Sequence, residues 1–421
     1  MAHLRDSPPL ICLVTPGHAA STPRLVRNAD ALSEAGYRVH VVAGRHFPQA
    51  DALDAELFRR AIWTYTQVGP GSGARALVRK AGRQLARAVV THPRFASIPI
   101  AARAFNSESA RLAAAAAQVS ADFYLGHCLA GLPAAAFAAK QRGVPYGFDA
   151  EDFHDAETEA SMADRADSTA RRVLQSALLP GCSHLTAASP LIGAQFESTY
   201  GVSPSTLLNV FPVSEGPHVP ADPGPVTEER AARFYWFSQT IGPGRGLESV
   251  IRIMGRMRTP SELHLRGFVS ADYMSELRSL SRQAGVARDI HFLPPGSPAE
   301  MPLLAATADL GLSTEERHPL SRDLWLTNKV FAYLLAGIPQ LLAKTRAQAD
   351  IAPTLGSAAL LCDLWQTEDA ARLLDSFFSD ARQVSAARLA AWDLARHIFC
   401  WDKEKEKLLA SIQRFLPLAR P

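Results

Sequence analysis

The sequence has few cysteines, no long apolar run and almost no net charge, and each shortage excludes a class of protein. Its five cysteines are scattered along 421 residues without a CxxC pair or a histidine-rich cluster, which argues against a disulfide framework and a structural zinc site. The formal net charge is only +3, so there is no global electrostatic case for binding nucleic acid. No apolar run is long enough to span a bilayer, and the N-terminus lacks an apolar signal core. We therefore expect a cytoplasmic protein with reduced thiols.

The length indicates two domains. A chain of 421 residues is too long for one compact domain and fits two of roughly 200 residues each. Residues 214–227 carry four prolines and two glycines, a composition typical of an interdomain linker. We expect an N-terminal domain over residues 1–213, a linker over 214–230, a second domain over 231–390 and terminal helices over 391–421.

Apolar runs alternate with helical patterns in both halves of the chain. The run at residues 10–15 predicts a buried parallel strand, the turn at Gly17 ends it, and a helix and a second strand follow. Such βαβ units build doubly wound sheets whose ligands lie beyond the carboxyl ends of the strands. The pattern predicts an α/β fold with two Rossmann-like domains, and the Gly17 turn is a candidate ligand edge. Ser21 and Arg24 follow it, although a helix cap and a solvated side chain would also explain them.

Polar residues follow two further predicted strands of the first half. His127 ends a short strand, which favours a role facing a site, while a core histidine is the alternative. Glu151 and Asp152 come directly after the next strand, ahead of a denser run of acids that a helix N-terminus would explain, namely Asp155, Glu157 and Glu159. One histidine beside carboxylates does not define a metal geometry, so we expect a ligand site without a metal here.

The second half opens on a glycine turn directly after the linker. An aromatic run from Phe234 breaks into the sequence IGPGRGLE, which contains Gly242, Gly244, Arg245 and Gly246 and leads into a helix. Glycines let the backbone approach an anion, a helix N-terminus offers N–H groups with partial positive charge, and arginine adds a full charge. The turn is therefore a candidate anion site, with a tight turn that merely needs small residues as the alternative.

Residues 74–103 contain no acidic residue, in contrast to the balanced charge of the whole chain. Seven basic residues are interleaved with apolar ones: Arg75, Arg79, Lys80, Arg83, Arg87, Arg94 and Arg103. A basic amphipathic helix can lie on an anionic membrane surface, while a solvated helix face is the ordinary explanation. Contact of residues 75–103 with a membrane surface is therefore a hypothesis.

Five stretches, in this order, resemble the GT-B glycosyltransferases, and the chain is most similar to the retaining family 4 enzymes that use nucleotide-sugar donors. They are a first βαβ unit (TPGHAASTPRLVRNADALSEAGYRVHVVA), a histidine strand end (ADFYLGHCLAGLPAA), an aspartate-rich strand end (FDAEDFHDAE), a turn for the donor diphosphate (SQTIGPGRGLES) and an Asn-Lys helix near the nucleoside (TNKVFAYLLAGIP). The resemblance implies two domains that face a central cleft, and terminal helices that cross back to the first domain.

The resemblance also implies roles for individual residues. The donor would be bound by Gly17, Gly242, Gly244, Arg245, Gly246, Glu315, Glu316, Asn328 and Lys329. Catalysis would involve His127, Glu151, Asp152, Arg245 and Lys329, and the acceptor would meet Ser21, Arg24, His127 and Asp152. The two cations would stabilise the departing diphosphate. Because the family usually works without a bound metal, no cofactor is expected besides the nucleotide-sugar co-substrate.

The chain departs from the family at Ala332, which stands where the second acid of a Glu-x7-Glu element is usual. We expect a transferase in surface polysaccharide or glycoconjugate assembly, with a saccharide or lipid-linked acceptor, no nucleic-acid partner and a place at the inner membrane face. The departure supports a second hypothesis, a noncatalytic partner protein that keeps the fold. A third is a sugar-nucleotide epimerase, in which cleft carboxylates would act as acid and base.

Overall fold

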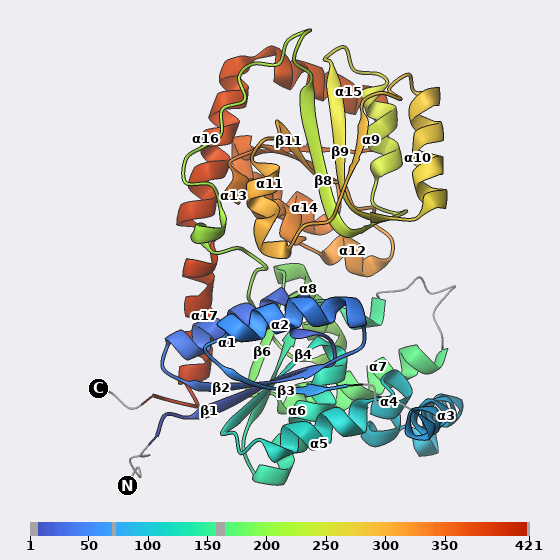
Figure 1. Ribbon diagram of the computed structural model, residues 1–421, viewed down its shortest axis with the longest axis vertical. Helices are drawn as coiled ribbons and strands as arrows, with labels where there is room; N and C mark the ends of the chain where they lie inside the picture. The colour runs from blue at the N-terminus through green and yellow to red at the C-terminus, as the bar shows by residue number, and fades with distance from the viewer. Residues whose placement is uncertain (1–6, 70–72, 157–164, 419–421) are drawn as a thin grey trace. The chain divides into compact units, whose positions relative to one another are not determined.

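The computed structural model describes residues 7–69, 73–156 and 165–418, and the chain divides into two compact units (Figure 1). One unit contains Met1–Leu207 and Lys405–Pro421, and the other contains Leu208–Glu404. The first unit thus ends before residue 213, and residues 391–404 of the predicted terminal segment belong to the second unit. The reason is local pairing: Leu208 N donates to Glu404 Oε1 at 2.7 Å, and Trp401 N donates to Phe211 O at 2.9 Å. Glu157 and Glu159 lie outside the described residues.

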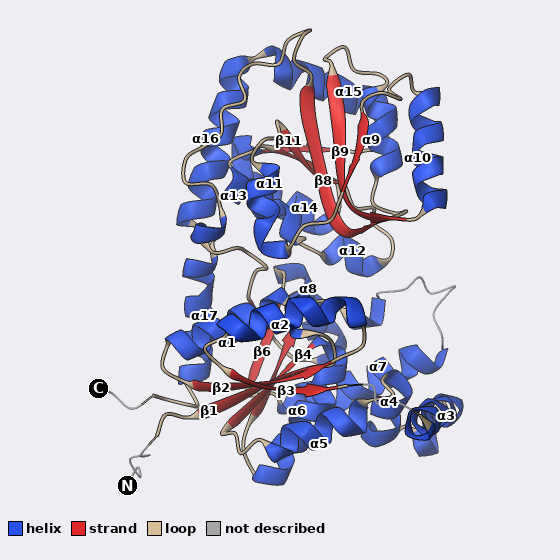
Figure 2. Cartoon of the chain, in the orientation of Figure 1, coloured by secondary structure: helices blue, strands red, loops and turns tan. Residues whose placement is uncertain are grey.

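The first unit is built on a parallel sheet of seven strands in the order β3-β2-β1-β4-β5-β6-β7. The strands are β1 (Leu10–Thr15), β2 (Arg38–Gly44), β3 (Thr64–Val68), β4 (Phe123–His127), β5 (Tyr146–Ala150), β6 (His184–Ala187) and β7 (Ser205–Thr206). Strand β1 is apolar along most of its length and lies near the middle of the sheet, with helices on both faces (Figure 2). Such a strand is buried from both sides, which is why it reads as a continuous apolar run.

Helices connect most of these strands in sequence. They are α1 (Pro23–Glu34), α2 (Asp51–Arg60), α3 (Ala74–Val90), α4 (Ile98–Phe105), α5 (Ser109–Gln118), α6 (Cys128–Arg142), α7 (Arg165–Leu178) and α8 (Pro190–Tyr200). The last helix, α17 (Trp401–Gln413), brings the chain end to this unit, where His184 Nδ1 is 2.8 Å from Ser411 Oγ and the Tyr37 hydroxyl donates to Leu416 O.

The second unit repeats the plan with a parallel sheet of six strands in the order β10-β9-β8-β11-β12-β13. The strands are β8 (Ala232–Ile241), β9 (Ser261–Val269), β10 (Ile290–Leu293), β11 (Leu310–Ser313), β12 (Gln340–Ala343) and β13 (Ala359–Cys362). The helices are α9 (Leu247–Met254), α10 (Ala271–Gln283), α11 (Met301–Ala305), α12 (Leu320–Leu324), α13 (Asn328–Ala336), α14 (Arg346–Leu355), α15 (Thr367–Ser379) and α16 (Ala381–His397). Two sheets with helices on both faces confirm the predicted α/β class with two doubly wound units.

The two faces of the second sheet differ in character. Phe234, Trp236, Leu263 and Leu265 alternate along β8 and β9 with partly polar neighbours and pack with α9, α10 and α15 in one apolar cluster. The opposite face carries Tyr235 and the side chains that alternate with the apolar ones. This period of two places one set of residues in the core and leaves the other for polar contacts.

Strand order reverses once in each sheet, between β1 and β4 and between β8 and β11. Where the order reverses, the connections after the two neighbouring strands run to opposite sides of the sheet. The loops at the carboxyl ends of these strands therefore separate and leave backbone groups exposed. Both glycine turns singled out in the sequence, at Gly17 and at Gly242–Gly246, follow the strand on one side of this reversal. The fold therefore marks one candidate ligand edge in each unit.

No helix among the described residues combines the length and the apolar character that a membrane crossing needs.

Helix α6 lies unusually close to the first sheet. A Cβ atom built on Gly131 would be 2.5 Å from Val14 O on β1, and one built on Gly126 would be 2.9 Å from the α6 backbone. Contacts below 3 Å to backbone require the helix to move. Glycine at these positions therefore sets the depth at which α6, and with it the helix N-terminus at Cys128, sits on the sheet.

Gly131→Ala should accordingly destabilise the protein by about 1–3 kcal/mol, because an added methyl group has no room in a packed interior. Gly193→Ala is the matched control: Gly193 lies within α8, and its added Cβ would meet only Pro204 O at 3.6 Å. That change should be neutral or stabilise by roughly 0.5–1 kcal/mol, since alanine favours helices over glycine. Urea unfolding followed by circular dichroism measures both, and equal effects of the two changes would contradict the packing argument.

Candidate functional site

The candidate site of the second unit is the turn between β8 and α9. Gly246 adopts a left-handed conformation with φ of 71°, and a Cβ atom built there would be 2.1 Å from Thr314 O. Thr314 Oγ1 in turn donates to Arg245 O at 2.8 Å. Glycine is thus required where the turn touches the loop after β11, whereas a Cβ atom at Gly242 would face open space. The turn after β8 and the loop after β11 therefore contact each other directly, through Gly246 and through this hydrogen bond.

The guanidinium of Arg245 has no hydrogen bond or ion pair with any residue that the structure describes, and the side chain is half-buried. It stands one residue before the cap of α9, whose first-turn N–H groups have no partner within the helix. Glu248, in that first turn, accepts a hydrogen bond from the Tyr273 hydroxyl at 2.6 Å. A cation, a helix N-terminus and small residues together suit a phosphate group.

Lys329, near this turn, forms a buried ion pair. Its Nζ donates to Glu315 Oε1 at 2.5 Å and sits 5.1 Å from the centre of the Trp236 ring. Burial acts to raise the pKa of Glu315, but the Lys329 charge and hydrogen bond outweigh it and hold that pKa below its ordinary value. The pair is nearly neutral as a whole, so it can fix the loop after β11 but adds little net positive charge.

Two other residues predicted to contact the donor, Glu316 and Asn328, lie beside this pair. The half-buried Glu316 and Asn328 have no side-chain hydrogen bond to any described residue, and Glu316 N approaches Gly244 O at 3.5 Å. Ala332, one turn along α13 from Asn328, is fully buried. The structure therefore gathers Glu315, Glu316, Asn328 and Lys329 next to the glycine turn.

Arg322 was not predicted from the sequence, yet it holds the glycine turn in place. Its Nη1 donates to Gly244 O at 2.9 Å and to His318 O at 3.1 Å. It belongs to the five-residue helix α12, within a stretch rich in charged residues. A helix this short shows no periodicity, so its arginine carried no signal.

The candidate site of the first unit is a pocket of about 290 Å³ at the carboxyl ends of β1, β4 and β5. Its lining residues follow the strand ends, open α6, end α4 or begin the short helical turn after β5: Pro16, Phe105, Cys128, Leu129, Ala130, Glu151, Asp152 and His154. Of the predicted residues, Glu151 and Asp152 therefore share a pocket. Phe105, which ends α4, was not predicted, since nothing in its sequence context sets it apart from other apolar residues.

Arg24 is buried and bound to Asp149, which lies on β5 two residues before Glu151 of the pocket. Its Nε and Nη2 donate to the two carboxylate oxygens at 2.6 and 2.7 Å, and Nη1 donates to Leu207 O at 2.6 Å. Asn28 and Thr186 also donate to Asp149, at 3.1 and 2.6 Å. Burial acts to raise the pKa of Asp149, but Arg24 and its neighbours hold it well below the ordinary value. Arg24 is thus placed to join β5 to α1 and Leu207, with its guanidinium turned toward these partners.

His127 ends β4 and is fully buried. Its Nδ1 lies 3.5 Å from Asp149 Oδ2, and neither ring nitrogen has a hydrogen-bond partner within the described part of the chain. Burial lowers its pKa to about 4, against the opposing charge of Asp149. The imidazole is therefore neutral near pH 7 and borders the Asp149 network.

Glu151 is a pocket residue whose protonation changes near neutral pH. Burial, with Asp149 and Asp152 nearby, raises its pKa to about 7 despite the opposing charges of Arg24 and His154. Its Oε1 is buried without a hydrogen-bond partner among the described residues. A carboxyl group with this pKa can both accept and donate a proton at neutral pH.

The turn after β1 supplies the remaining predicted residues. Gly17 faces open space, and the exposed Ser21 ends a short helical turn. His18 between them is buried: its Nδ1 is 2.7 Å from Asp54 Oδ2, and its Nε2 accepts hydrogen bonds from two backbone amides. The hydrogen bonds of the buried His18 therefore fix the turn, while Gly17 and Ser21 remain accessible.

Cys128 opens α6 with a φ of 54°, a left-handed conformation that is uncommon outside glycine. Burial, helped by the charges of Glu151 and Asp152, raises the pKa of its thiol far above the ordinary value. It is therefore not a thiolate nucleophile. A strained residue between strand and helix often marks a functional site, but the sequence shows no sign of its conformation.

The two-unit architecture is that of the GT-B glycosyltransferases. Among solved structures, Anabaena Alr3699/HepE in complex with UDP matches with a TM-score of 0.70 and 14% identity, over 96% of this chain and 100% of that one, and it is also solved with UDP-glucose. WaaG, a glycosyltransferase involved in lipopolysaccharide biosynthesis, matches with a TM-score of 0.57 and 14% identity, over 96% of this chain and 98% of that one. A proposed UDP-N-acetylglucosamine 2-epimerase from Listeria monocytogenes matches with a TM-score of 0.56 and 12% identity, over 99% and 98%. No protein-family model and no curated sequence matches the chain. At these identities the likeness shows the fold.

The raised pKa of Glu151 gives a test by pH. Because its pKa rises from 4.5 to about 7 on folding, the native state holds the proton more tightly than the unfolded state. The resulting stabilisation is complete below about pH 4.5 and is lost as pH rises through about 7. Relative to Glu151→Gln, the wild type should lose on the order of 2–3 kcal/mol of unfolding free energy across that range. Urea titrations at several pH values measure it, with Glu56→Gln on the exposed face of α2 as the control. Parallel pH profiles for wild type and Glu151→Gln would contradict the assignment.

Proposed function

We propose that the protein is a glycosyltransferase that moves a sugar from a nucleotide-sugar donor to an acceptor hydroxyl. The observation that carries the proposal is the glycine turn at the end of β8, where Arg245 has no ionic partner among the described residues and stands beside the N-terminus of α9. The HepE structures, which share the fold, contain UDP and UDP-glucose. A diphosphate is the ligand that such a turn suits best.

In this proposal the second unit binds the donor. Backbone N–H groups of the turn and the Arg245 guanidinium contact the diphosphate, whose negative charge grows as the bond to the sugar breaks. Glu316 and Asn328 are available for the nucleoside, since their side chains have no hydrogen bond to described residues. Lys329 acts as a positioning residue through Glu315, because its ammonium is committed to that carboxylate. Arg245 and the helix N-terminus balance the leaving-group charge, so we assign no metal ion to the transfer.

The first unit supplies the acceptor side. Glu151 and Asp152 line a pocket at the strand ends, and the pKa of Glu151 near 7 suits a group that takes a proton from a hydroxyl as it attacks. The neutral imidazole of His127 lies next to Asp149 at the end of β4. Retention of the anomeric configuration belongs to the proposal on the strength of the sequence resemblance, and the anomeric proton coupling of the product in NMR tests it.

A lipid-linked acceptor in surface polysaccharide assembly is the finer part of the proposal, and helix α3 supports it. Leu77, Val78 and Leu85 are 69%, 70% and 68% exposed, which is unusual for large apolar residues on a helix. The basic residues divide into two groups. Arg79, Arg83 and Arg87 bind Glu108, Ala104 O and Asp167, while Arg75, Lys80, Arg94 and Arg103 are exposed. Exposed apolar and basic side chains on one helix suit an anionic lipid surface.

Removing the diphosphate contact tests the donor site. Arg245→Ala should weaken binding of UDP roughly 10- to 100-fold, because a charge-assisted hydrogen bond contributes about 1.5–3 kcal/mol. The melting temperature should stay unchanged, since Arg245 makes no ion pair with described residues. Arg252→Ala, which changes an exposed arginine of α9, is the control. Calorimetric titration measures both variants, and equal affinities would remove the glycine turn from the donor site.

The same preparation separates the three hypotheses. Incubation with UDP-sugars should give slow donor hydrolysis and, with acceptor, transfer. Conversion of the donor to an isomer without acceptor would favour the epimerase. If wild type binds no nucleoside diphosphate at all, the noncatalytic scaffold becomes the better explanation.

Neutralising α3 tests membrane contact. Each basic residue near an anionic surface contributes about 1 kcal/mol, so Arg75→Gln with Lys80→Gln should lower binding to vesicles containing phosphatidylserine roughly 30-fold at low salt. Added salt should abolish the difference, because the attraction is screened. The control replaces Arg252 and Arg382, exposed arginines of the second unit, by Gln. Vesicle co-sedimentation measures it, and wild type that does not sediment with vesicles would favour a soluble acceptor.

A further inference from the structure

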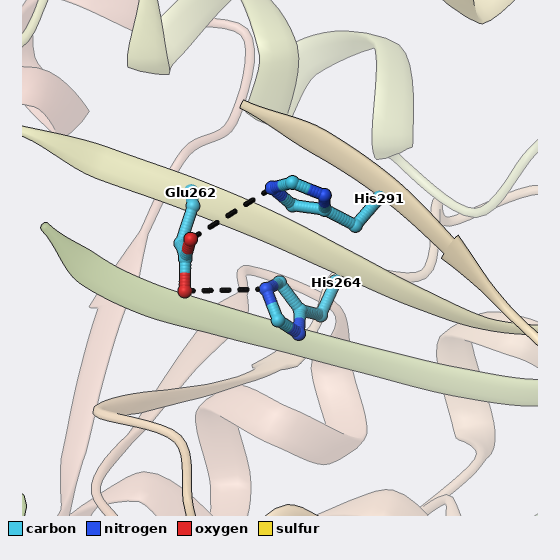
Figure 3. Close-up of side chains that lie close together, drawn as sticks. All are labelled: Glu262, His264 and His291. Atoms are coloured by element: carbon cyan, nitrogen blue, oxygen red, sulfur yellow. Dashed lines mark ion pairs between the residues drawn. The ribbon is translucent and has the colours of Figure 1, made fainter. Parts of the chain in front are cut away.

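Three polar side chains meet on the second sheet, outside the proposed donor site. Glu262 and His264 are two residues apart on β9 and therefore project from the same face. His291 lies on the neighbouring edge strand β10 and is in parallel register with His264. Figure 3 shows the two imidazole rings turned toward the carboxylate of Glu262. The parallel pairing of β9 with β10 thus brings together residues that are far apart in the sequence.

The spacing of these groups matches a metal-binding set. One ligand atom from each residue lies within 4.8 Å of the others. Nε2 of His264 is 3.2 Å from Glu262 Oε1, and Nε2 of His291 is 3.7 Å from Glu262 Oε2. The side chains are 18%, 43% and 24% exposed for His264, His291 and Glu262, so an ion can reach them from solvent. Small rotations of the side chains would bring all three ligand atoms to coordination distance.

We propose that Glu262, His264 and His291 form a binding site for a divalent transition-metal ion such as Zn²⁺. Two imidazoles and one carboxylate are a ligand set typical of zinc and its neighbours, with a remaining position for water. Mg²⁺ and Ca²⁺ are disfavoured because they take mainly oxygen ligands, and only one carboxylate is offered. The backbone pairing of β9 and β10 already orients the side chains.

Arg233 on β8 bears on the site in two ways. Its Nε donates to Glu262 Oε1 at 2.7 Å, which fixes the carboxylate and leaves Oε2 for a metal. Such a partner behind a ligand is common in metal sites. Its charge also opposes a dication, so we expect moderate affinity. Arg266, two residues beyond His264 on the same face, instead donates to the Tyr235 hydroxyl and to Pro294 O.

The consequence of binding would be structural. Strand β10 is the outermost strand of the sheet, and an ion held by β9 and β10 together would join them through side chains as well as backbone. Because the ion binds the folded sheet and not the unfolded chain, it should raise stability in proportion to its concentration. The site would therefore act on the stability of the second unit and not on the transfer step.

Calorimetric titration of Zn²⁺ into the full-length chain, freed of metal and of any purification tag, tests the proposal. Wild type should bind one ion at micromolar or lower concentration, and His264→Ala, His291→Ala and Glu262→Gln should each weaken binding at least about 10-fold. The control is His397→Ala, an exposed histidine at the end of α16, which should leave binding unchanged.

Thermal unfolding provides a second readout that does not depend on activity. With a chelator, wild type and His291→Ala should melt alike; with saturating Zn²⁺, wild type alone should gain several degrees. Co²⁺ absorption would report imidazole coordination in wild type. The proposal is overturned if wild type shows no saturable binding up to about 0.1 mM Zn²⁺, or if all three variants bind as wild type does.

Discussion

A carboxylate that stays ionised when buried in a protein must be paired, and this constraint fixes the loops at the strand ends of both units. Asp149 in the first unit is bound by Arg24, and Glu315 in the second is bound by Lys329. Removing one partner from such a pair leaves an uncompensated charge and typically costs several kcal/mol. Each pair also connects a strand end to a helix, α1 in one unit and α13 in the other. The cations that stabilise the two ligand edges are therefore committed, and ligand charge must be met by other residues.

This distinction separates Arg245 from Arg24 and Lys329, the other cations predicted to lie at a ligand edge. Arg24 and Lys329 turn their charges inward, while Arg245 stands on a turn whose backbone is fixed by Thr314 and Arg322. The glycines make that arrangement possible, because Gly246 touches the Thr314 carbonyl where no side chain would fit. A rigid turn with an uncommitted cation is preorganised for an anion, and preorganisation is what lowers the cost of binding. The need for glycine and the need for an uncommitted positive charge are thus both met within residues 242–246.

Much of the fold could be predicted from periodicity, since central strands such as β1 and β8 read as apolar runs and the two glycine turns follow these two strands directly. Boundaries were less accurate where pairing across the sequence decides them. Strand β7 is limited to Ser205–Thr206, because the Leu207 carbonyl accepts a hydrogen bond from Arg24 and the Leu208 amide donates to Glu404. Helix α12 was missed because five residues are too few to show a period.

The candidate sites could be located from the sequence but not resolved into roles. Strand ends identified Glu151 and His127 as polar residues near a ligand edge, where ligands of parallel sheets bind. Lys329 was identified only through the family resemblance of its helix. Whether a side chain faces the ligand or the interior depends on its partners, and Asp149 and Glu315 lie more than ten residues from the cations that bind them. The neighbouring histidines of β9 and β10, His264 and His291, were also missed. Their proximity depends on how the two strands pair, which the local sequence does not predict.

Ala332 shows how this reasoning bears on the departure from the family pattern. Asn328 and Ala332 are four residues apart on α13 and so share a face of the helix. Asn328 is half-buried, whereas Ala332 is fully enclosed among apolar side chains, so the polar surface of this helix ends one turn early. Under the proposed function, a carboxylate for a ribose hydroxyl would then come from another element. Glu316 follows β11, approaches Gly244 through its backbone and makes no side-chain hydrogen bond to a described residue. An acid moved from the helix to the adjacent loop would keep donor recognition within the same group of residues, which is why the absence of an acid at 332 does not by itself argue for a protein without activity.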